Sequence, residues 1–189
     1  MATNSKLSTR DRLLAATATL TYTEGVGVGV QALCQAAGVS KRSLYQLFAS
    51  KDDLVAESLR QRAAGYAALF LPPKDDDRSP RERILHVFEQ LATVAGRRDY
   101  RGCPYLAAQV EIKDIHNPAF RVARKTKRLL TDFFRAEAQR GGAEDPALLA
   151  RQLMIVFDGA AGRAGIGADT VKGVVTSTAA VLLDAAGVR

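Results

Sequence analysis

The sequence has few residues of the kinds that build redox and metal sites, and no long apolar run. The separation of its two cysteines, Cys34 and Cys103, fits neither a metal site nor a redox pair, so we expect reduced thiols in a reducing compartment. The two histidines, His86 and His116, are too few and too far apart to predict metal ligation. No apolar run could cross a bilayer, and the polar start MATNSKLSTRDR gives no signal-peptide pattern. We therefore expect a cytoplasmic protein with no membrane contact, metal or cofactor.

Patterns typical of enzymes are also absent. A helical enzyme would use Cys103, His86 or Asp158, but no nucleophile, base and orienting group share a recognisable motif. The repeat GVGVGV, from Gly25 to Val30, lacks the G-x-G-x-x-G spacing of a dinucleotide loop, and no strand precedes it. We predict that the protein is not an enzyme and that this repeat is a loop between helices.

The positive charge is informative through its distribution. The formal net charge of +7 permits association with a polyanion, but residues 1–60 have an excess of only +2 and residues 61–189 an excess of +5. The stretch from Gly25 to Lys51 has no acidic residue and three basic ones, Lys41, Arg42 and Lys51. This local absence of acidic residues indicates a surface that an anion can approach.

Helix start signals and apolar spacing predict an all-α fold of about nine helices. Serine or proline start signals stand at Ser8, Ser40, Ser50, Ser79, Pro104, Pro118 and Pro146, and a last helix is predicted from about Asp169 to Ala186. A glycine turn at Gly38 joins two short helices and a third precedes them, which is the helix-turn-helix pattern. We predict a DNA-binding domain over residues 1–54 and a second helical domain over residues 55–189.

The helix that begins after Ser40 has the side chains that a DNA groove can use. Its apolar residues Leu44, Leu47 and Phe48 are expected to pack inward, which leaves Lys41, Arg42, Ser43, Tyr45 and Gln46 outward or at the edge. Arginine or lysine can donate to guanine, glutamine can bridge adenine, and a tyrosine hydroxyl can reach phosphate. Lys51, at the start of the next helix, suits a phosphate oxygen. For Tyr45, packing against a neighbouring helix is a rival interpretation, and both roles can hold because a tyrosine can pack its ring and still offer its hydroxyl.

The run AAGVSKRSLYQLFASKDDL, residues 36–54, resembles the recognition-helix signature of the TetR family of transcriptional regulators, and the resemblance extends from Thr9 to Leu54. It implies that Ser43, Tyr45 and Lys51 contact DNA, and that Gln31, Lys41, Arg42 and Gln46 help to set sequence preference. Two residues depart from the family pattern. Leu47 stands where a phosphate-contacting histidine is common, and Gly29 stands where a capping serine or threonine is common.

For residues 55–189 the resemblance implies a domain that binds a small molecule and dimerises through its last two helices. Aromatic positions at helical spacing are usually core residues, but together the aromatic and polar residues on the middle helices are the candidates for ligand contact: Tyr66, Phe70, Phe88, Cys103, Tyr105, Gln109, Phe133 and Phe157. The segment RGCPYLAAQVEI, residues 101–112, resembles a Gly-Cys-Pro-aromatic element of one group of such regulators. That likeness places Cys103 and Tyr105 near the pocket, and the structural alternative is a proline-started helix with a buried thiol.

The resulting hypothesis is a homodimeric repressor that binds double-stranded DNA at a palindromic operator. A small, mostly apolar or aromatic effector would release it. The alternative is a helical ligand-binding or partner-binding protein whose DNA-binding motif is weakened. The basic group from Arg121 to Arg128 could touch DNA or acidic ligands, or be an ordinary solvated helix face.

Overall fold

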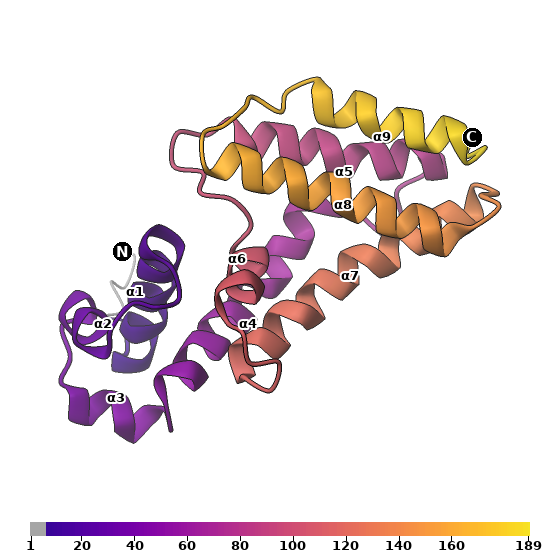
Figure 1. Cartoon of the computed structure of the whole chain (residues 1–189). Helices are drawn as coiled ribbons and strands as arrows, with labels where there is room; N and C mark the ends of the chain where they lie inside the picture. The colour runs from indigo at the N-terminus through magenta and orange to yellow at the C-terminus, as the bar shows by residue number, and fades with distance from the viewer. Residues whose placement is uncertain (1–6) are drawn as a thin grey trace, which may run out of the picture. The chain divides into compact units, whose positions relative to one another are not determined.

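The computed structural model describes residues 7–189, which form nine α-helices and no β-strand, so the all-α prediction is confirmed (Figure 1). The helices are α1 Thr9–Glu24, α2 Val30–Ala37, α3 Lys41–Leu47, α4 Lys51–Phe70, α5 Pro80–Ala95, α6 Pro104–Glu111, α7 Pro118–Arg140, α8 Pro146–Gly165 and α9 Val174–Ala185. None of the helices in this part of the chain combines the length and apolar character that crossing a lipid bilayer requires.

Serine side chains cap the helices where the sequence predicts them. At the starts of α1, α3, α4 and α5, a serine hydroxyl accepts the backbone N–H three residues ahead: Ser8 from Asp11, Ser40 from Ser43, Ser50 from Asp53 and Ser79 from Glu82. At Ser79 the Glu82 carboxylate also accepts the Ser79 N–H, which completes a capping box. Each cap satisfies a backbone donor that the helix itself leaves free and contributes about 1 kcal/mol.

Contacts divide the described chain into two compact units. The first comprises residues 7–62 and 107–124, and the second comprises residues 63–106 and 125–189. Helices α4, α6 and α7 contribute residues to both units. These units are groups of residues in spatial contact, and each contains two separate stretches of the chain. The predicted domain boundary between residues 54 and 55 therefore stays a prediction.

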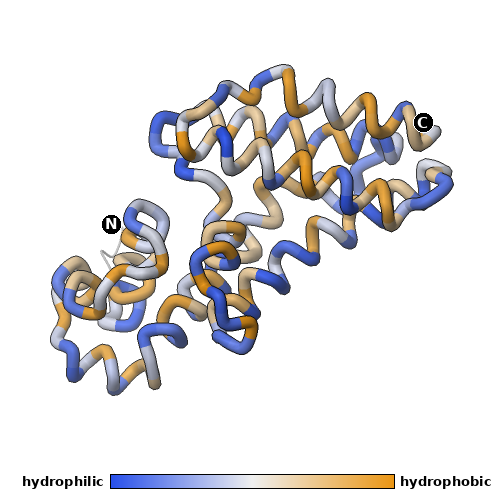
Figure 2. Tube along the Cα trace, viewed as in Figure 1, coloured by the Kyte–Doolittle hydropathy of each residue, from blue (hydrophilic) through white to orange (hydrophobic). Residues whose placement is uncertain are grey.

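The first unit is built around the three N-terminal helices. Leu13 of α1, Leu33 of α2, Leu44 of α3 and Leu54 of α4 are all fully buried in one core cluster. Burial of each leucine contributes about 1.5 to 3 kcal/mol, so this cluster fixes α3 against α1 and α2. Figure 2 shows the alternation of apolar and polar positions along these helices.

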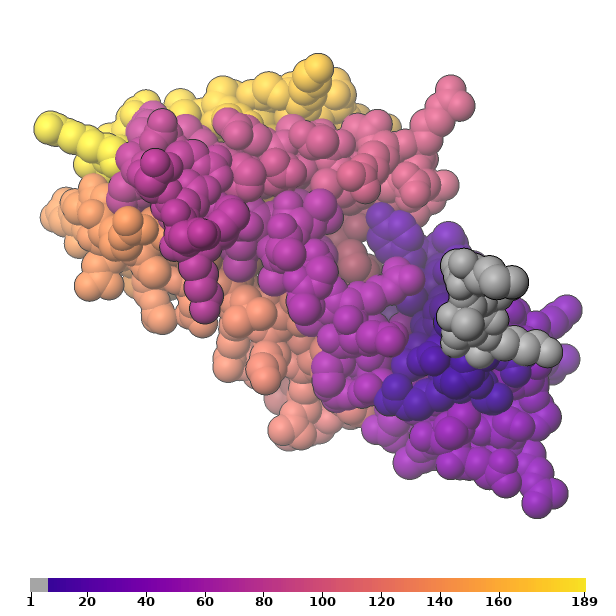
Figure 3. All heavy atoms as spheres, turned by 180° about the vertical axis from the view of Figure 1, so that it is seen from behind, coloured from indigo at the N-terminus to yellow at the C-terminus, as the bar shows by residue number. Residues whose placement is uncertain are grey.

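The second unit is built around α5, α8 and α9, which pack against one another. Figure 1 shows the three helices side by side, and Figure 3 shows α9, in yellow, beside α5 at the surface. The buried residues Val87 and Leu91 of α5, Leu153 of α8 and Leu183 of α9 contribute to the core.

Two details differ from the predicted pattern. Helix α9 begins at Val174, about five residues later than predicted, because Gly173 has a φ of +79°, which ends any continuous helix at that point. Leu47 was predicted to pack inward, but it is the last residue of α3 and is 43% exposed. The chain becomes extended at Phe48, which is buried as predicted.

Candidate nucleic-acid interface

The turn between α2 and α3 is fixed by backbone geometry and by one arginine. Gly38 has a φ of +63° and donates its N–H to the Gln35 carbonyl, while Val39 donates to the Cys34 carbonyl. Arg12 of α1 donates from Nη1 to the carbonyls of Ala37 and Gly38, at 3.1 and 3.2 Å. This closure orients α3, and nothing in the sequence around Arg12 signals its role.

Helix α3 presents a polar face away from its core. Lys41, Arg42, Tyr45 and Gln46 are exposed, and Leu44 is fully buried on the opposite side. Tyr45 is 54% exposed, so its ring is not enclosed by a neighbouring helix. The face therefore has two cations, a phenol and an amide available to a partner, all on one short helix.

The other predicted DNA contacts are in different environments. Ser43 is half-buried and its hydroxyl shares a hydrogen bond with that of Ser40, at 2.9 Å. Gln31 is exposed in the first turn of α2, whose N-cap, Gly29, makes no side-chain capping bond. The half-buried Lys51 donates from Nζ to the carbonyls of Val26 and Val28, at 3.1 and 3.3 Å. Because an ammonium has three donors, one remains for a phosphate, and that contact stays a prediction.

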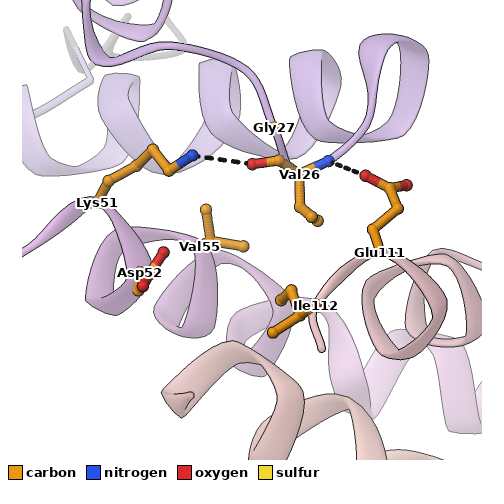
Figure 4. A pocket seen from close by; sticks show the side chains of 7 residues that line it. All are labelled: Val26, Gly27, Lys51, Asp52, Val55, Glu111 and Ile112. Carbon is orange, nitrogen blue, oxygen red and sulfur yellow. Dashed lines mark hydrogen bonds between the residues drawn. The ribbon is translucent and has the colours of Figure 1, made fainter. Parts of the chain in front are cut away.

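A pocket of about 280 Å³ lies beside the α1–α2 connection (Figure 4). The carboxylate of Glu111, the last residue of α6, accepts the Val26 N–H at 2.7 Å. On the opposite side of Val26, Lys51 Nζ donates to the Val26 carbonyl. Asn117, just before α7, donates to the Asp52 carboxylate in the first turn of α4, at 2.8 Å. Glu111 and Asn117 thus join the helix-turn-helix to residues far along the chain, and no sequence pattern marked either of them.

Most of the predicted ligand contacts are brought together in the second unit. Between ring centroids, Tyr66 lies 4.7 Å from Tyr105 and 4.9 Å from Phe70. The Phe157 ring centroid lies 5.2 Å from that of Phe70 and 6.5 Å from that of Phe88. These rings form a continuous aromatic cluster, which we call the aromatic core. A cavity of about 10 Å³ adjoins Tyr66 and Phe70, which is about the space that one water needs. A larger molecule would have to displace side chains to enter there.

Cys103 and Tyr66 form a polar contact at the edge of the aromatic core. The Tyr66 hydroxyl and the Cys103 sulfur share a hydrogen bond of 3.0 Å, and the sulfur also accepts the Leu106 N–H at 3.4 Å. Burial, reinforced by the neighbouring Cys103, raises the pKa of the Tyr66 phenol well above its ordinary value. Tyr66 therefore stays protonated and can serve as a hydrogen-bond donor.

An ion pair between α7 and α8 lies against the aromatic core. Lys127 of α7 pairs with Asp158 of α8, and its ammonium lies 4.7 Å from the centroid of the Phe157 ring. Within the predicted basic group, Lys127 is buried. The spacing of Ala123, Lys127, Leu130 and Phe134 could have revealed this, because all four fall on the buried face of α7.

Two predicted ligand residues lie elsewhere. Phe133 is half-buried, and the Arg83 guanidinium lies 5.8 Å from the centroid of the Phe133 ring. The centroids of the Phe133 and Phe134 rings are 5.9 Å apart. Gln109 is half-buried and belongs to the first unit. Among the described residues, no group of three or more His, Cys, Asp or Glu side chains is placed to hold a metal ion.

Comparison with known proteins gives a consistent relationship. Residues 13–58 match the family model of bacterial regulatory proteins of the tetR family. A crystal structure from Streptomyces avermitilis, of a protein classed as a TetR-type transcriptional regulator, is 61% identical, with a TM-score of 0.94 over 97% of this chain and 100% of that chain.

More distant structures share the fold. A TetR-family regulator from Streptomyces coelicolor is 23% identical, with a TM-score of 0.85 over 95% of this chain and 96% of that chain. The reduced form of NemR from E. coli is 22% identical, with a TM-score of 0.77 over 93% and 95%. No curated protein is significantly similar in sequence.

Proposed function

The chain belongs to the TetR family of bacterial transcriptional regulators, and from this premise we propose that it is a homodimeric repressor of a palindromic operator. A small, mostly apolar or aromatic molecule releases it from DNA. The proposed localisation is the cytoplasm, where a bacterial regulator meets its DNA. The observation that carries the proposal is the face of α3, where exposed Lys41, Arg42, Tyr45 and Gln46 stand opposite a fully buried Leu44.

The chemistry of that face suits the major groove. The stretch from Gly25 to Lys51 contains no carboxylate that would repel phosphates. Arg42 can donate to guanine O6 and N7, and Gln46 can bridge adenine N6 and N7. Two such helices, one from each subunit, read half-sites about one helical turn apart, which makes the operator palindromic.

Apolar side chains on the last two helices support the homodimer. Leu148 and Ile155 of α8, and Val174 and Val181 of α9, are all exposed in the single chain. A two-fold interface over these helices would remove the four apolar groups from water in both subunits.

The aromatic core supports the choice of effector. Aromatic rings, the protonated Tyr66 and the Lys127–Asp158 pair offer apolar contact together with a few polar groups, as small-molecule sites do. The coupling between effector and operator is expected to be about 1 to 3 kcal/mol and reciprocal, so operator DNA weakens effector binding by the same factor. Equal effector affinity with and without operator would rule out this mechanism of release.

The test of DNA binding is selection of bound sequences from random duplex DNA by the purified protein, at two salt concentrations. We expect enrichment of a two-fold-symmetric site. The double variant Arg42→Ala, Gln46→Ala should lose that sequence preference, because these are the proposed base-reading residues. A matched control, Gln61→Ala with Arg62→Ala, removes the same two side-chain types from exposed positions on α4 and should retain it.

Two other outcomes separate the alternatives. Salt-sensitive retention of DNA without any enriched sequence would mean that the helix-turn-helix binds DNA only through its positive charge. No retention at all would favour the ligand-binding or partner-binding protein, which the departures at Leu47 and Gly29 already make conceivable.

A further inference from the structure

The first half of α7 has a basic face that the proposed function does not use. Arg121, Arg124, Lys125 and Arg128 recur at intervals of three and four residues, so they share one side of the helix. All four are exposed, whereas Ala123 and Leu130 on the opposite side are buried. Figure 3 shows side chains of α7, in salmon, at the molecular surface.

This face lacks the neutralising partners that other basic residues have. In the first unit, Arg10 pairs with Glu57, Arg12 donates to the α2–α3 turn, and Lys51 donates to the α1–α2 connection. Among the described residues of that unit, the basic side chains with no ion pair or side-chain hydrogen bond are Lys41, Arg42, Arg62, Arg121 and Arg124. Two members of the α7 face are thus as available to an anion as the α3 residues proposed to read DNA.

The sequence around this face also contains no acidic residue. From Ile115 to Thr131 there is no aspartate or glutamate, as there is none from Gly25 to Lys51. The first turn of α7 has no carboxylate to compensate the positive end of the helix dipole. An ordinary solvated helix face would mix both signs of charge, so the composition favours a polyanion as the partner.

The start of α7 is held within the same unit as the helix-turn-helix. Asn117 donates to Asp52 at 2.8 Å, and Asp52 follows Lys51, the residue predicted to contact phosphate. Arg121 lies one helical turn beyond Asn117, about 6 Å along the α7 axis. Residues 107–124 belong to the unit that contains α1, α2 and α3.

We propose that Arg121 and Arg124 bind the phosphate backbone of DNA, in addition to the contacts made by the helix-turn-helix. The inference rests on the proposed DNA binding and extends its footprint to a segment far from α3 in sequence. Contacts of this kind position a protein on the duplex but do not discriminate between bases. They should therefore raise affinity for all sequences alike.

The test is the salt dependence of DNA affinity, measured for the selected operator and for an unrelated duplex. In the double variant Arg121→Gln, Arg124→Gln, the slope of log affinity against log salt should become less negative by about 0.9 for each phosphate that the variant no longer neutralises. Affinity at low salt should fall for both duplexes, and the enriched sequence should stay the same. The variant Arg121→Lys, Arg124→Lys keeps both charges and should keep most of the slope.

The matched control is Arg97→Gln with Arg98→Gln, an exposed pair after α5 whose replacement changes the net charge by the same amount. Its slope should equal that of the wild type. Equal slopes for the α7 variant, its control and the wild type would overturn the inference and leave the proposed function intact. An altered slope in both double variants would overturn it too, because the effect would then come from net charge. No DNA binding by the wild type would overturn both proposals.

Discussion

Glu137 and Arg83 form an ion pair that is almost completely enclosed in the second unit. Their side chains are 6% and 8% exposed, and Arg83 Nε lies 3.1 Å from Glu137 Oε1. Arg83 also donates to the carbonyls of Pro73 and Asp76, and Arg140 donates to the second oxygen of Glu137. The arrangement ties the start of α5 to the end of α7.

The variant Glu137→Ala is expected to lose about 3 kcal/mol of unfolding free energy, because it leaves the Arg83 guanidinium buried without a counter-charge. Denaturant-induced unfolding measures this loss. The control is Asp132→Ala on the same helix, which removes the partner of exposed Arg135 and should cost about 0 to 1 kcal/mol. Equal losses in the two variants would show that burial does not strengthen the Arg83–Glu137 pair.

Tyr66 gives the structure a stability component that depends on alkaline pH. Burial raises the pKa of its phenol in the folded state, so above the ordinary value of about 10 the unfolded chain releases this proton while the folded chain retains it. The contribution of Tyr66 to the free energy of unfolding is therefore fully present below pH about 10 and decreases as the pH rises further.

The variant Tyr66→Phe has no phenolic proton and should lack that decline. Near neutral pH it should be about 1 kcal/mol less stable than the wild type, because it loses the hydrogen bond to Cys103. Unfolding free energies of both proteins, measured from pH about 8 to about 11, should show this difference shrinking as the pH rises. A difference that stays constant over the range would contradict the assignment.

At the scale of elements, the connection between α1 and α2 depends on Gly25. Gly25 has φ +90° and ψ 170°, a conformation that is essentially restricted to glycine. A Cβ at this position would also lie 2.7 Å from Oε2 of Glu111, the oxygen that accepts the Val26 N–H. Both effects act on the same connection, between two helices that support α3.

The variant Gly25→Ala is therefore expected to lose about 1 to 3 kcal/mol of unfolding free energy. Gly27→Ala in the same connection is the control, because no atom lies within 4 Å of its Cβ position and its φ is not in the left-handed region. Thermal or chemical unfolding compares the two. A loss in Gly27→Ala as large as in Gly25→Ala would mean that the whole connection tolerates no side chain.

The helices were predictable because their signals are local. Serine caps, first-turn prolines and apolar spacing located all nine helices of the described chain, and the exposed face of α3 followed from its buried Leu44. The partners of these elements could not be predicted in the same way. The Glu111 carboxylate accepts the Val26 N–H across 85 positions of sequence, and Lys127 of α7 pairs with Asp158 of α8. Such contacts depend on tertiary packing, which leaves no local pattern.

At the scale of the whole molecule, the proposed repressor needs two subunits to read a palindrome. Ile155 on α8 is 72% exposed and Val181 on α9 is 65% exposed, which are large values for branched apolar side chains. In a two-fold interface each residue occurs twice, so one substitution changes two places. A charge at Ile155 would therefore act on the interface without touching the core of either unit.

The variant Ile155→Lys is expected to raise the dimer dissociation constant at least about 100-fold, because each burial of an apolar side chain is worth about 1.5 to 3 kcal/mol and two are lost. Sedimentation equilibrium measures the constant. Gln139→Lys, at an exposed position of α7, adds the same charge and should leave it unchanged. The monomeric variant should keep its helical content but lose operator affinity, because a single α3 contacts only one half-site. An unchanged dissociation constant would place the subunit interface away from Ile155, and the operator would then be read through a different subunit arrangement.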